Sequence, residues 1–243
     1  MRLIPRRKVL AGFTGLAAGA HVARARPSIE TAPSVLIVGV STYDYLAPLP
    51  SAIRDAALMD GMFRSLGYQT TMLANPSKEE FLYGLAKFIT TSKQSSLMLA
   101  YVAAHGAMLA GQNHIFFRDG RTIEDRVPET ILLQAMNDQP RQKILFLDTC
   151  REAPISYARE YSDIKQYKAG THVSYAAQPG APAIDGQSGY SPYAKALQDA
   201  LKTPGLDISE INRKVRLRVL RETNGLQIPW ERSSLLQPVI LNL

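Results

Sequence analysis

Three continuous apolar segments of strand length constrain the fold of this chain more than any other feature of its sequence. They cover residues 35–40, 97–104 and 143–147. An unbroken apolar run is typical of a strand in a sheet that is covered on both faces, as parallel sheets are. Segments with helical spacing of apolar residues alternate with these runs. We therefore predict an α/β fold, a three-layer sandwich with helices on both faces of a mainly parallel sheet of about six strands.

Local signals place the remaining elements. Ser77 and Glu80 form a capping box at the start of one helix, Ser191 caps another, and Gly67 ends a helix that begins near residue 52. The helix after Ser77 is expected to turn inward the side chains of Phe81, Leu82, Leu85, Phe88 and Ile89. The other predicted elements are helices at 129–137 and from about residue 208, strands at 68–73, 171–177 and 238–242, a short hairpin at 111–120, and a loop at 178–189.

The N-terminal segment has the pattern of an export signal. Basic residues precede a stretch of small and apolar residues at 9–20, and Ala23-Arg24-Ala25 provides a cleavage site. The Arg6-Arg7 pair favours twin-arginine export, with the general secretory route as the alternative. A membrane anchor is less favoured, because this stretch is shorter than the roughly 20 residues that a spanning helix needs.

We therefore divide the chain into an export signal peptide at 1–25, a short leader at 26–33 and one domain at 34–243. The domain is expected to be exported, periplasmic or secreted, without a stable membrane span. Removal of the signal takes away five basic residues and no acidic one, so the formal net charge falls from +7 to +2. Nucleic-acid binding is not expected at this charge. The basic run at 213–221 alternates with apolar residues, which is typical of a solvated helix face.

Cys150 is the only cysteine of the chain, and it closely follows the apolar run at 143–147, as His105 follows the run at 97–104. Residues in this position emerge at the carboxyl edge of the sheet, where open α/β sheets bind ligands. If the two strands are neighbours, the imidazole can take the thiol proton and later protonate a leaving amine. A small core cysteine and a structural histidine are the alternative. We interpret the two residues as a catalytic dyad.

The order of these parts resembles the caspase-like cysteine peptidases, and more closely their bacterial metacaspase and orthocaspase relatives of the C14 type. The resemblance extends over nearly all of residues 34–243 and is most specific in Ala103-Ala104-His105-Gly106 and Asp148-Thr149-Cys150-Arg151. It implies a caspase-like fold and a cysteine endopeptidase with His105 and Cys150 as the dyad. The amides of Gly106 and Cys150 would then donate to the oxyanion. Further matching segments lie at 38–43, 49–56, 175–180, 191–193 and 227–235.

Two acidic residues bear on the substrate of such an enzyme. Asp148 lies two residues before Cys150, so in an extended segment both side chains leave the same face. By the resemblance, Asp55 shares with Asp148 the pocket for the residue before the scissile bond. Two carboxylates in one partly buried pocket repel each other unless a cation enters, so we expect protein or peptide substrates that are cleaved after Arg or Lys. The alternative for Asp55 is an acidic residue near a helix N-terminus, stabilised by the helix dipole.

The chain departs from the family pattern in two places. Ala103 and Ala104 stand where metacaspases often have Ser-Gly, and His114 stands where an aromatic residue is usual; we interpret His114 as structural. No cofactor is required by the sequence, and no Cys/His spacing matches a zinc site. Related metacaspases can depend on calcium, but Asp163 and Asp185 are interpreted as solvated loop residues, so no metal is assigned.

The segment at 151–170 is often a processing linker in the family. It carries Arg159, Lys165 and Lys168, and we expect the enzyme to cut itself there.

Two other functions compete with a peptidase. One is a binding or scaffolding module that has kept the fold and the dyad. The other is a nucleotide-binding domain, which is less favoured because the loop at 41–48 lacks the glycines that let a backbone approach a pyrophosphate.

Overall fold

The computed structural model describes residues 32–109, 111–136, 142–152, 168–186 and 189–243. The expected export signal, most of the leader and most of the expected processing segment lie outside these residues. No helix in the described part of the chain is long and apolar enough to cross a lipid bilayer.

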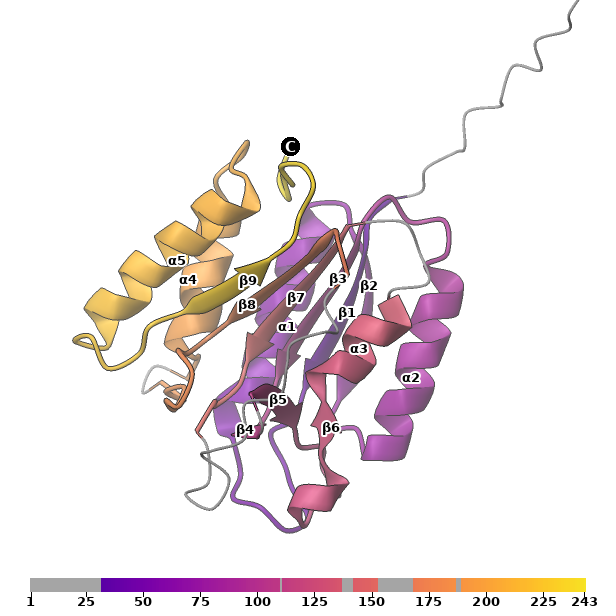
Figure 1. The fold of residues 1–243 in the computed structure, drawn as a ribbon, viewed down its shortest axis with the longest axis vertical. Coiled ribbons are helices and arrows are strands. Elements are labelled where there is room, and N and C mark those ends of the chain that lie inside the picture. Colours follow the sequence, from indigo (N-terminus) through magenta and orange to yellow (C-terminus); the bar gives the residue numbers. More distant parts are fainter. Residues whose placement is uncertain (1–31, 110, 137–141, 153–167, 187–188) are drawn as a thin grey trace, which may run out of the picture.

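A six-stranded, mainly parallel sheet forms the middle layer of the molecule (Figure 1). Its strands are β1 (Ser34–Gly39), β2 (Gln69–Ala74), β3 (Met98–Ala103), β7 (Lys143–Asp148), β8 (Thr171–Tyr175) and β9 (Trp230–Ser233). They lie in the order β2-β1-β3-β7-β8-β9, and only β9 runs antiparallel to its neighbour. Every residue of β1, β3, β7 and β8 is buried, which confirms the prediction of strands covered on both faces.

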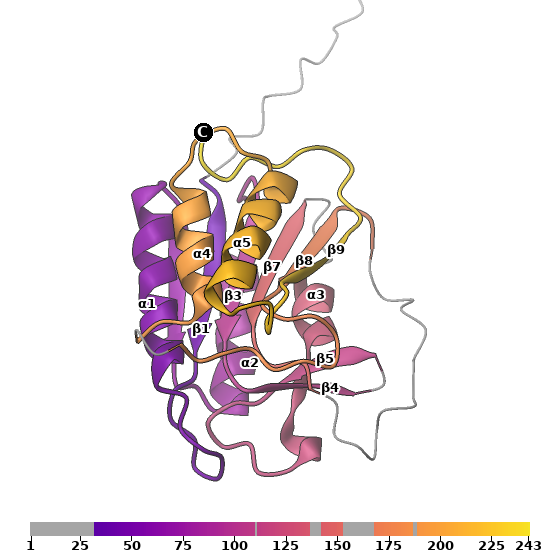
Figure 2. The same ribbon diagram turned by 90° about the vertical axis from the view of Figure 1, so that its left-hand side faces the viewer.

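Helices cover both faces of this sheet, as predicted (Figures 1 and 2). On one face lie α1 (Pro50–Ser65), α4 (Pro192–Leu201) and α5 (Ile208–Glu222), and on the other lie α2 (Lys78–Thr91) and α3 (Glu129–Met136). Each face has its own hydrophobic cluster. Successive residues of β1, β3 and β7 alternate between the two clusters, as the pleat of a strand requires. The two clusters together fix the central strands in place.

The helices begin where their capping residues predict. The Ser77 side chain accepts a hydrogen bond from the amide of Glu80, whose carboxylate accepts in turn from the amide of Ser77, so the predicted capping box is confirmed. Ser191 caps α4, with a proline in the first turn. Asp207 and Glu210 form a further capping box at the start of α5. Ser191 has a second role, because it also donates hydrogen bonds to Asp55 and Asp148.

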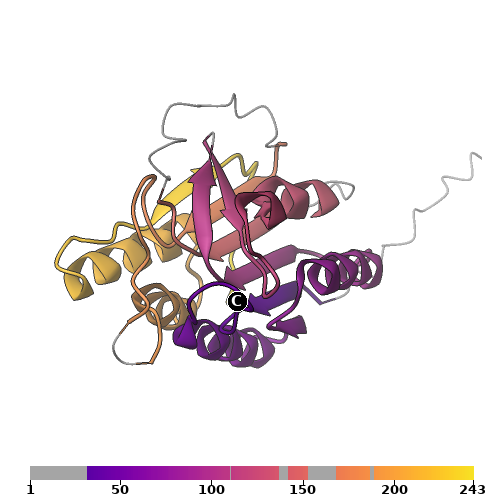
Figure 3. The same cartoon turned by 90° about the horizontal axis from the view of Figure 1, so that it is seen from below.

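A second, small sheet lies across the carboxyl end of the main one (Figure 3). It consists of β4 (Gly106–Leu109), β5 (Gln112–Ile115) and β6 (Val127–Pro128), with a short 3-10 helix (Ile123–Asp125) before β6. The hairpin predicted at 111–120 therefore begins earlier than expected, directly after His105. Its strands are short, and two of the buried residues of β5, Asn113 and His114, are polar, so no long apolar run marks them in the sequence.

Two further predictions are wrong. The segment 238–242 is not a strand: Val239 and Leu241 pack into the hydrophobic cluster beside α1, and Ile240 makes only an isolated bridge with Asp207. The sixth strand is instead β9, which is a half-exposed edge strand with two charged residues in its middle and so gives no apolar signal. Leu82 of α2 does not face the core, since its side chain is 39% exposed.

The contrast between Leu85, which is buried beneath α2, and Leu82 on the same helix gives a matched test. Leu85→Ala should lower the free energy of unfolding by about 2–5 kcal/mol, because it leaves a cavity. Leu82→Ala should change it by less than about 1 kcal/mol. Helix propensity cancels, since both variants carry the same substitution. Urea unfolding followed by circular dichroism measures the difference, and equal losses would contradict this packing.

Candidate active site

Pairing of β3 with β7 brings His105 and Cys150 to the same level of the sheet. The two strands are parallel neighbours, and Ala103 lies opposite Asp148 in their register. Each of the two candidate residues follows its strand by the same number of positions, two beyond this last pair. The expectation that the two strands are neighbours is therefore met, and both residues leave the sheet at its carboxyl edge.

The His105 ring is held by two residues of the loop that follows β1. Its Nε2 lies 2.8 Å from the carbonyl oxygen of Ala47, and its ring centroid lies 4.7 Å from that of Tyr43. The backbone amide of His105 donates to the Tyr43 hydroxyl over 2.8 Å. Because a carbonyl oxygen can only accept, Nε2 carries the hydrogen, and in the neutral imidazole Nδ1 is left with a lone pair. The ring is thus oriented to accept a proton at Nδ1.

The Cys150 thiol contacts the backbone of Ala183. The amide of Ala183 donates to Sγ over 3.3 Å, and the thiol donates to the carbonyl oxygen of the same residue over 3.6 Å. Burial raises the pKa of Cys150, the hydrogen bond from the Ala183 amide lowers it in part, and the carboxylates of Glu152, Asp148 and Asp185 raise it further. The free protein therefore holds a thiol rather than a thiolate at neutral pH. Both Cys150 and His105 are described, and no hydrogen bond joins them.

Gly106, which follows the histidine, is packed against the cysteine segment. A Cβ atom built at this position would lie 2.7 Å from Cβ of Thr149 and 2.8 Å from the carbonyl oxygen of Cys150. These distances are too short for any side chain, so only glycine lets the start of β4 approach the segment after β7. The close approach fixes the distance between the chain segments that carry His105 and Cys150.

Arg151 secures the cysteine segment from the other side, and sequence reasoning treated it only as a flanking residue. Its side chain is completely buried. Nε donates to the side-chain oxygen of Asn113 in β5 over 2.9 Å, and a terminal nitrogen donates to the carbonyl oxygen of Ala177 over 3.2 Å. The guanidinium lies 3.9 Å from the ring centroid of Tyr175. Arg151 thus links the segment after β7 to the small sheet and to β8.

Asp55 and Asp148 lie together, buried, and share Ser191. The Ser191 hydroxyl donates to Asp148 over 2.5 Å, while its amide donates to both oxygens of Asp55 over 3.1 and 3.3 Å. Tyr101 donates a further hydrogen bond to Asp148 over 2.9 Å. No described Lys or Arg side chain forms an ion pair with either carboxylate. The first turn of α1 holds no acidic residue, so the helix dipole does not account for Asp55.

Without a neighbouring cation, the pKa values of both carboxyl groups are raised. Burial raises the pKa of Asp55, and the negative charge of Asp148 raises it further. Burial likewise raises the pKa of Asp148, against the hydrogen bonds from Ser191 and Tyr101, which lower it. The pair therefore retains protons at pH values where ordinary carboxyls have lost them.

A narrow cavity joins these carboxylates to the thiol. Its volume is about 20 Å³, which is room for about one water molecule. Three of the residues that line it were assigned to the site from the sequence: Asp55, Asp148 and Cys150. Four others were not: Ser51, Ala183, Asp185 and Ser191. Ser191 was recognised only as a helix cap and Asp185 only as a loop residue, because nothing in the sequence shows that they face α1.

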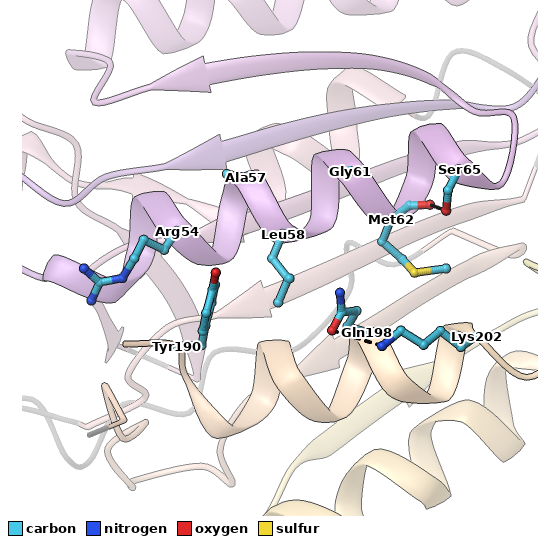
Figure 4. A pocket seen from close by; sticks show the side chains of 9 residues that line it. All are labelled: Arg54, Ala57, Leu58, Gly61, Met62, Ser65, Tyr190, Gln198 and Lys202. Carbon is cyan, nitrogen blue, oxygen red and sulfur yellow. Dashed lines mark hydrogen bonds between the residues drawn. The ribbon is translucent and has the colours of Figure 1, made fainter. Parts of the chain in front are cut away.

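A wider groove of about 550 Å³ lies between α1 and α4, away from the thiol (Figure 4). Leu58 and Met62 of α1 project into it, and Tyr190 and Lys202 mark its two ends. Neither member of the candidate dyad lines it. The small cavity, and not this groove, is lined by the candidate residues Cys150, Asp55 and Asp148. No group of three or more His, Cys, Asp or Glu side chains within the described residues could hold a metal ion.

Comparison with known proteins identifies the class. The family model for the caspase domain of the C14 peptidases matches residues 33–240, and the chain belongs to this family. Membership implies a cysteine peptidase, a hydrolase. Among solved structures, the chain is similar to caspase-1 from Spodoptera frugiperda, with a TM-score of 0.70 and 16% identity over 88% of this chain and 90% of that one. At this identity the likeness shows the fold, and the predicted caspase-like α/β sandwich is confirmed. No curated protein matches the chain in sequence.

Gly106→Ala should lower both stability and the reactivity of the site, because the added methyl group forces the segment at Thr149 and Cys150 to move. A loss of about 1–3 kcal/mol in the free energy of unfolding is expected for such overpacking. Gly61→Ala is the matched control: nothing lies within 4 Å of a Cβ built there, within α1, and the substitution should stabilise the protein by about 0.5–1 kcal/mol. Thermal and urea unfolding measure both. Equal effects at the two glycines would contradict the close contact.

Proposed function

We propose that this protein is a cysteine endopeptidase that uses His105 and Cys150 as its catalytic dyad and cleaves after Arg or Lys. The observation that carries the dyad is the shared register of β3 and β7, which sends both residues to one edge from neighbouring strand ends. The observation that carries the specificity is the pair of buried carboxylates, Asp55 and Asp148, beside the thiol in one cavity.

The first half of the reaction forms an acyl-enzyme. Nδ1 of His105 takes the proton of the Cys150 thiol, and the sulfur attacks the carbonyl carbon before the scissile bond. The amides of Gly106 and Cys150 donate to the oxyanion of the tetrahedral intermediate. His105 then gives its proton to the leaving amine, and the C–N bond breaks. The contact between Nε2 and the Ala47 carbonyl keeps the ring oriented.

The second half restores the enzyme. His105 takes a proton from a water molecule, the hydroxide attacks the thioester carbonyl, and the carboxylic acid product leaves as the sulfur regains a proton from the imidazolium. The raised pKa of Cys150 makes the histidine necessary in the first step, because little thiolate forms without a base.

The charge of the pocket selects the substrate. A guanidinium or ammonium group between Asp55 and Asp148 supplies the positive charge that no described residue provides, and a guanidinium can bond both carboxylates. An aspartate side chain would add a third negative charge to the same buried space. A scaffolding protein with the same fold is the alternative. It is less well supported, because a buried, uncompensated acidic pair beside a thiol costs stability and serves no purpose in a scaffold.

Replacement of either member of the dyad should abolish turnover of a fluorogenic peptide that ends in Arg. Cys150→Ala removes the nucleophile, and His105→Ala removes a base whose contribution is about 10²–10⁴-fold. Both variants should keep the native circular dichroism spectrum. His114→Gln is the matched control: burial lowers the pKa of this β5 histidine to about 4, it takes no part in the steps above, and turnover should persist.

The outcomes separate the alternatives. A peptide that ends in Asp should not be cleaved, and its hydrolysis would overturn the assignment of the pocket. Undiminished activity of the His105 variant would point to another base. Hydrolysis of neither peptide by the wild-type protein would favour the scaffold.

Binding of a cation to the pocket should strengthen as the pH rises through neutrality. The raised pKa values of Asp55 and Asp148 mean that the free pair holds protons there, and a bound guanidinium favours the fully ionised pair, so binding releases protons. Release of one proton increases the affinity by up to about tenfold per pH unit. Calorimetry with benzamidine, in two buffers of different ionisation enthalpy, measures both quantities. Asp55→Asn should flatten the dependence and Asp60→Asn should not. An affinity that falls with rising pH would contradict the proposal.

A further inference from the structure

Residues 183–185, here called the cover, lie over the thiol in the structure. The cover follows β8, beyond a buried alanine at position 181, and its residues are half-buried. Its backbone occupies both hydrogen-bonding directions of the sulfur: the amide of Ala183 donates to Sγ of Cys150, and the carbonyl oxygen of Ala183 accepts from the thiol. The thiol proton is therefore directed at the cover and not at His105.

Two contacts hold the cover in this place. On one side the Ser51 hydroxyl, in the first turn of α1, donates to the carboxylate of Asp185. On the other side the amide of Ile184 donates to the side-chain oxygen of Gln227 over 2.9 Å. Gln227 is completely buried and is itself fixed by a 2.9 Å bond to the carbonyl oxygen of Ala176. The contact with Gln227 is thus an anchor, whereas the contact between Ser51 and Asp185 joins two separate parts of the molecule.

The end of the cover also has a defined shape. Gly186 has a φ of 77°, and a Cβ atom there would lie only 2.0 Å from the carbonyl oxygen of Tyr190. Only glycine adopts this turn without a clash. Gly186 thus lies close to Tyr190, the residue before Ser191, and Asp185 lines the same cavity as Asp55 and Asp148.

In this arrangement the pocket is too small for a substrate side chain. A cavity of about 20 Å³ has room for about one water molecule and not for an arginine or lysine side chain. A substrate side chain that enters the pocket must therefore move residues of its lining, and two residues of the cover next to the thiol, Ala183 and Asp185, are among them. The obvious point of release is the hydrogen bond between Ser51 and Asp185, because Asp185 is the one charged group of the cover and a cation competes directly for it.

We propose that the cover is a self-inhibitory segment, latched by the hydrogen bond from Ser51 to Asp185, and that a cationic substrate side chain opens it by drawing Asp185 to itself as the third carboxylate of the pocket. The part of this proposal that concerns the substrate rests on the proposed function. The latch itself does not, since it follows from the contacts of the free protein.

The accessibility of the thiol tests the latch without any need for peptidase activity. The rate of Cys150 alkylation by iodoacetamide is measured against pH, because its plateau at high pH reports access to the thiolate and its midpoint reports the pKa. Ser51→Ala removes the latch without removing a charged side chain, so the plateau should rise by about tenfold, the effect of losing one such hydrogen bond. Asp185→Ala should raise the plateau and also move the midpoint to lower pH, because the Asp185 charge raises the pKa of Cys150.

Asp60→Ala is the matched control, since Asp60 pairs with Arg64 at the far end of α1 and does not line the cavity. It should leave both the plateau and the midpoint unchanged. Ser51→Thr keeps a hydroxyl and should react as slowly as the wild type, which separates the latch from a general loosening of α1. Circular dichroism melts identify any variant that fails to fold, and the remaining variants then decide the question.

The assay with arginyl peptide, run on the same proteins, separates failure of the latch from failure of the proposed function. Faster alkylation in Ser51→Ala with no hydrolysis by any variant keeps the latch and removes the peptidase. Hydrolysis by the wild type with an unchanged plateau in both Ser51→Ala and Asp185→Ala overturns the latch. If both ideas hold, Ser51→Ala lowers KM for the arginyl peptide, because less work is needed to open the pocket, while Asp185→Ala raises KM, because one carboxylate of the open pocket is gone.

Discussion

The parallel pairing of β3 with β7 is the constraint on which the rest of the candidate site depends. Its register sets the ends of the two strands at one level, and the two hydrophobic clusters hold the strands from both faces. Beyond the last paired residues, hydrogen bonds between the strands no longer set the position of the backbone, and contacts of other residues must do so. The fit of Gly106 against the cysteine segment and the buried guanidinium of Arg151 are the two contacts that do so. The positions of His105 and Cys150 are thus set by packing beyond the end of the sheet as well as by the pairing of the strands.

The buried acidic pair works against this stability. In the unfolded chain both carboxyls have ordinary pKa values, whereas in the folded protein the pKa values of Asp55 and Asp148 are raised. The folded state therefore binds more protons at intermediate pH, and the stability of the protein falls as the pH rises through the folded-state values. The hydrogen bonds from Ser191 and Tyr101 offset part of this cost without removing it. A protein that retains such a pair gains something else from it, and cation recognition is the gain that the surrounding chemistry supports.

The sequence was sufficient for the architecture because the central strands are apolar along their whole length and the helix caps are explicit, as at Ser77 and Ser191. It failed for β9 and for the hairpin that begins at Gly106, because a half-exposed edge strand, and short strands whose buried residues include polar ones, show no apolar run. In the site, His105, Cys150, Asp55 and Asp148 were recognisable by their position and by resemblance to a family. The roles of Ser51, Ser191 and Asp185 were not, since these residues come together only when α1, α4 and the segment after β8 fold against one another. Contacts between loops and distant helices leave no periodic trace in a sequence.

Under the proposed function, the negative charge that would select the substrate also disfavours the thiolate of Cys150. Burial raises the pKa of Cys150 most, and the carboxylates of Glu152, Asp148 and Asp185 raise it further, so the free protein disfavours the thiolate. A cation in the pocket would offset the charges of Asp148 and Asp185, and that part of the Coulomb interaction that holds the proton on sulfur would then be lost. A substrate with Arg or Lys would thus lower the energy of the reactive ionisation state as it binds, whereas a neutral substrate of the same shape would not. Specificity of this kind acts on the chemical step as well as on affinity, because part of the binding energy of the cation is expressed only when the sulfur becomes charged.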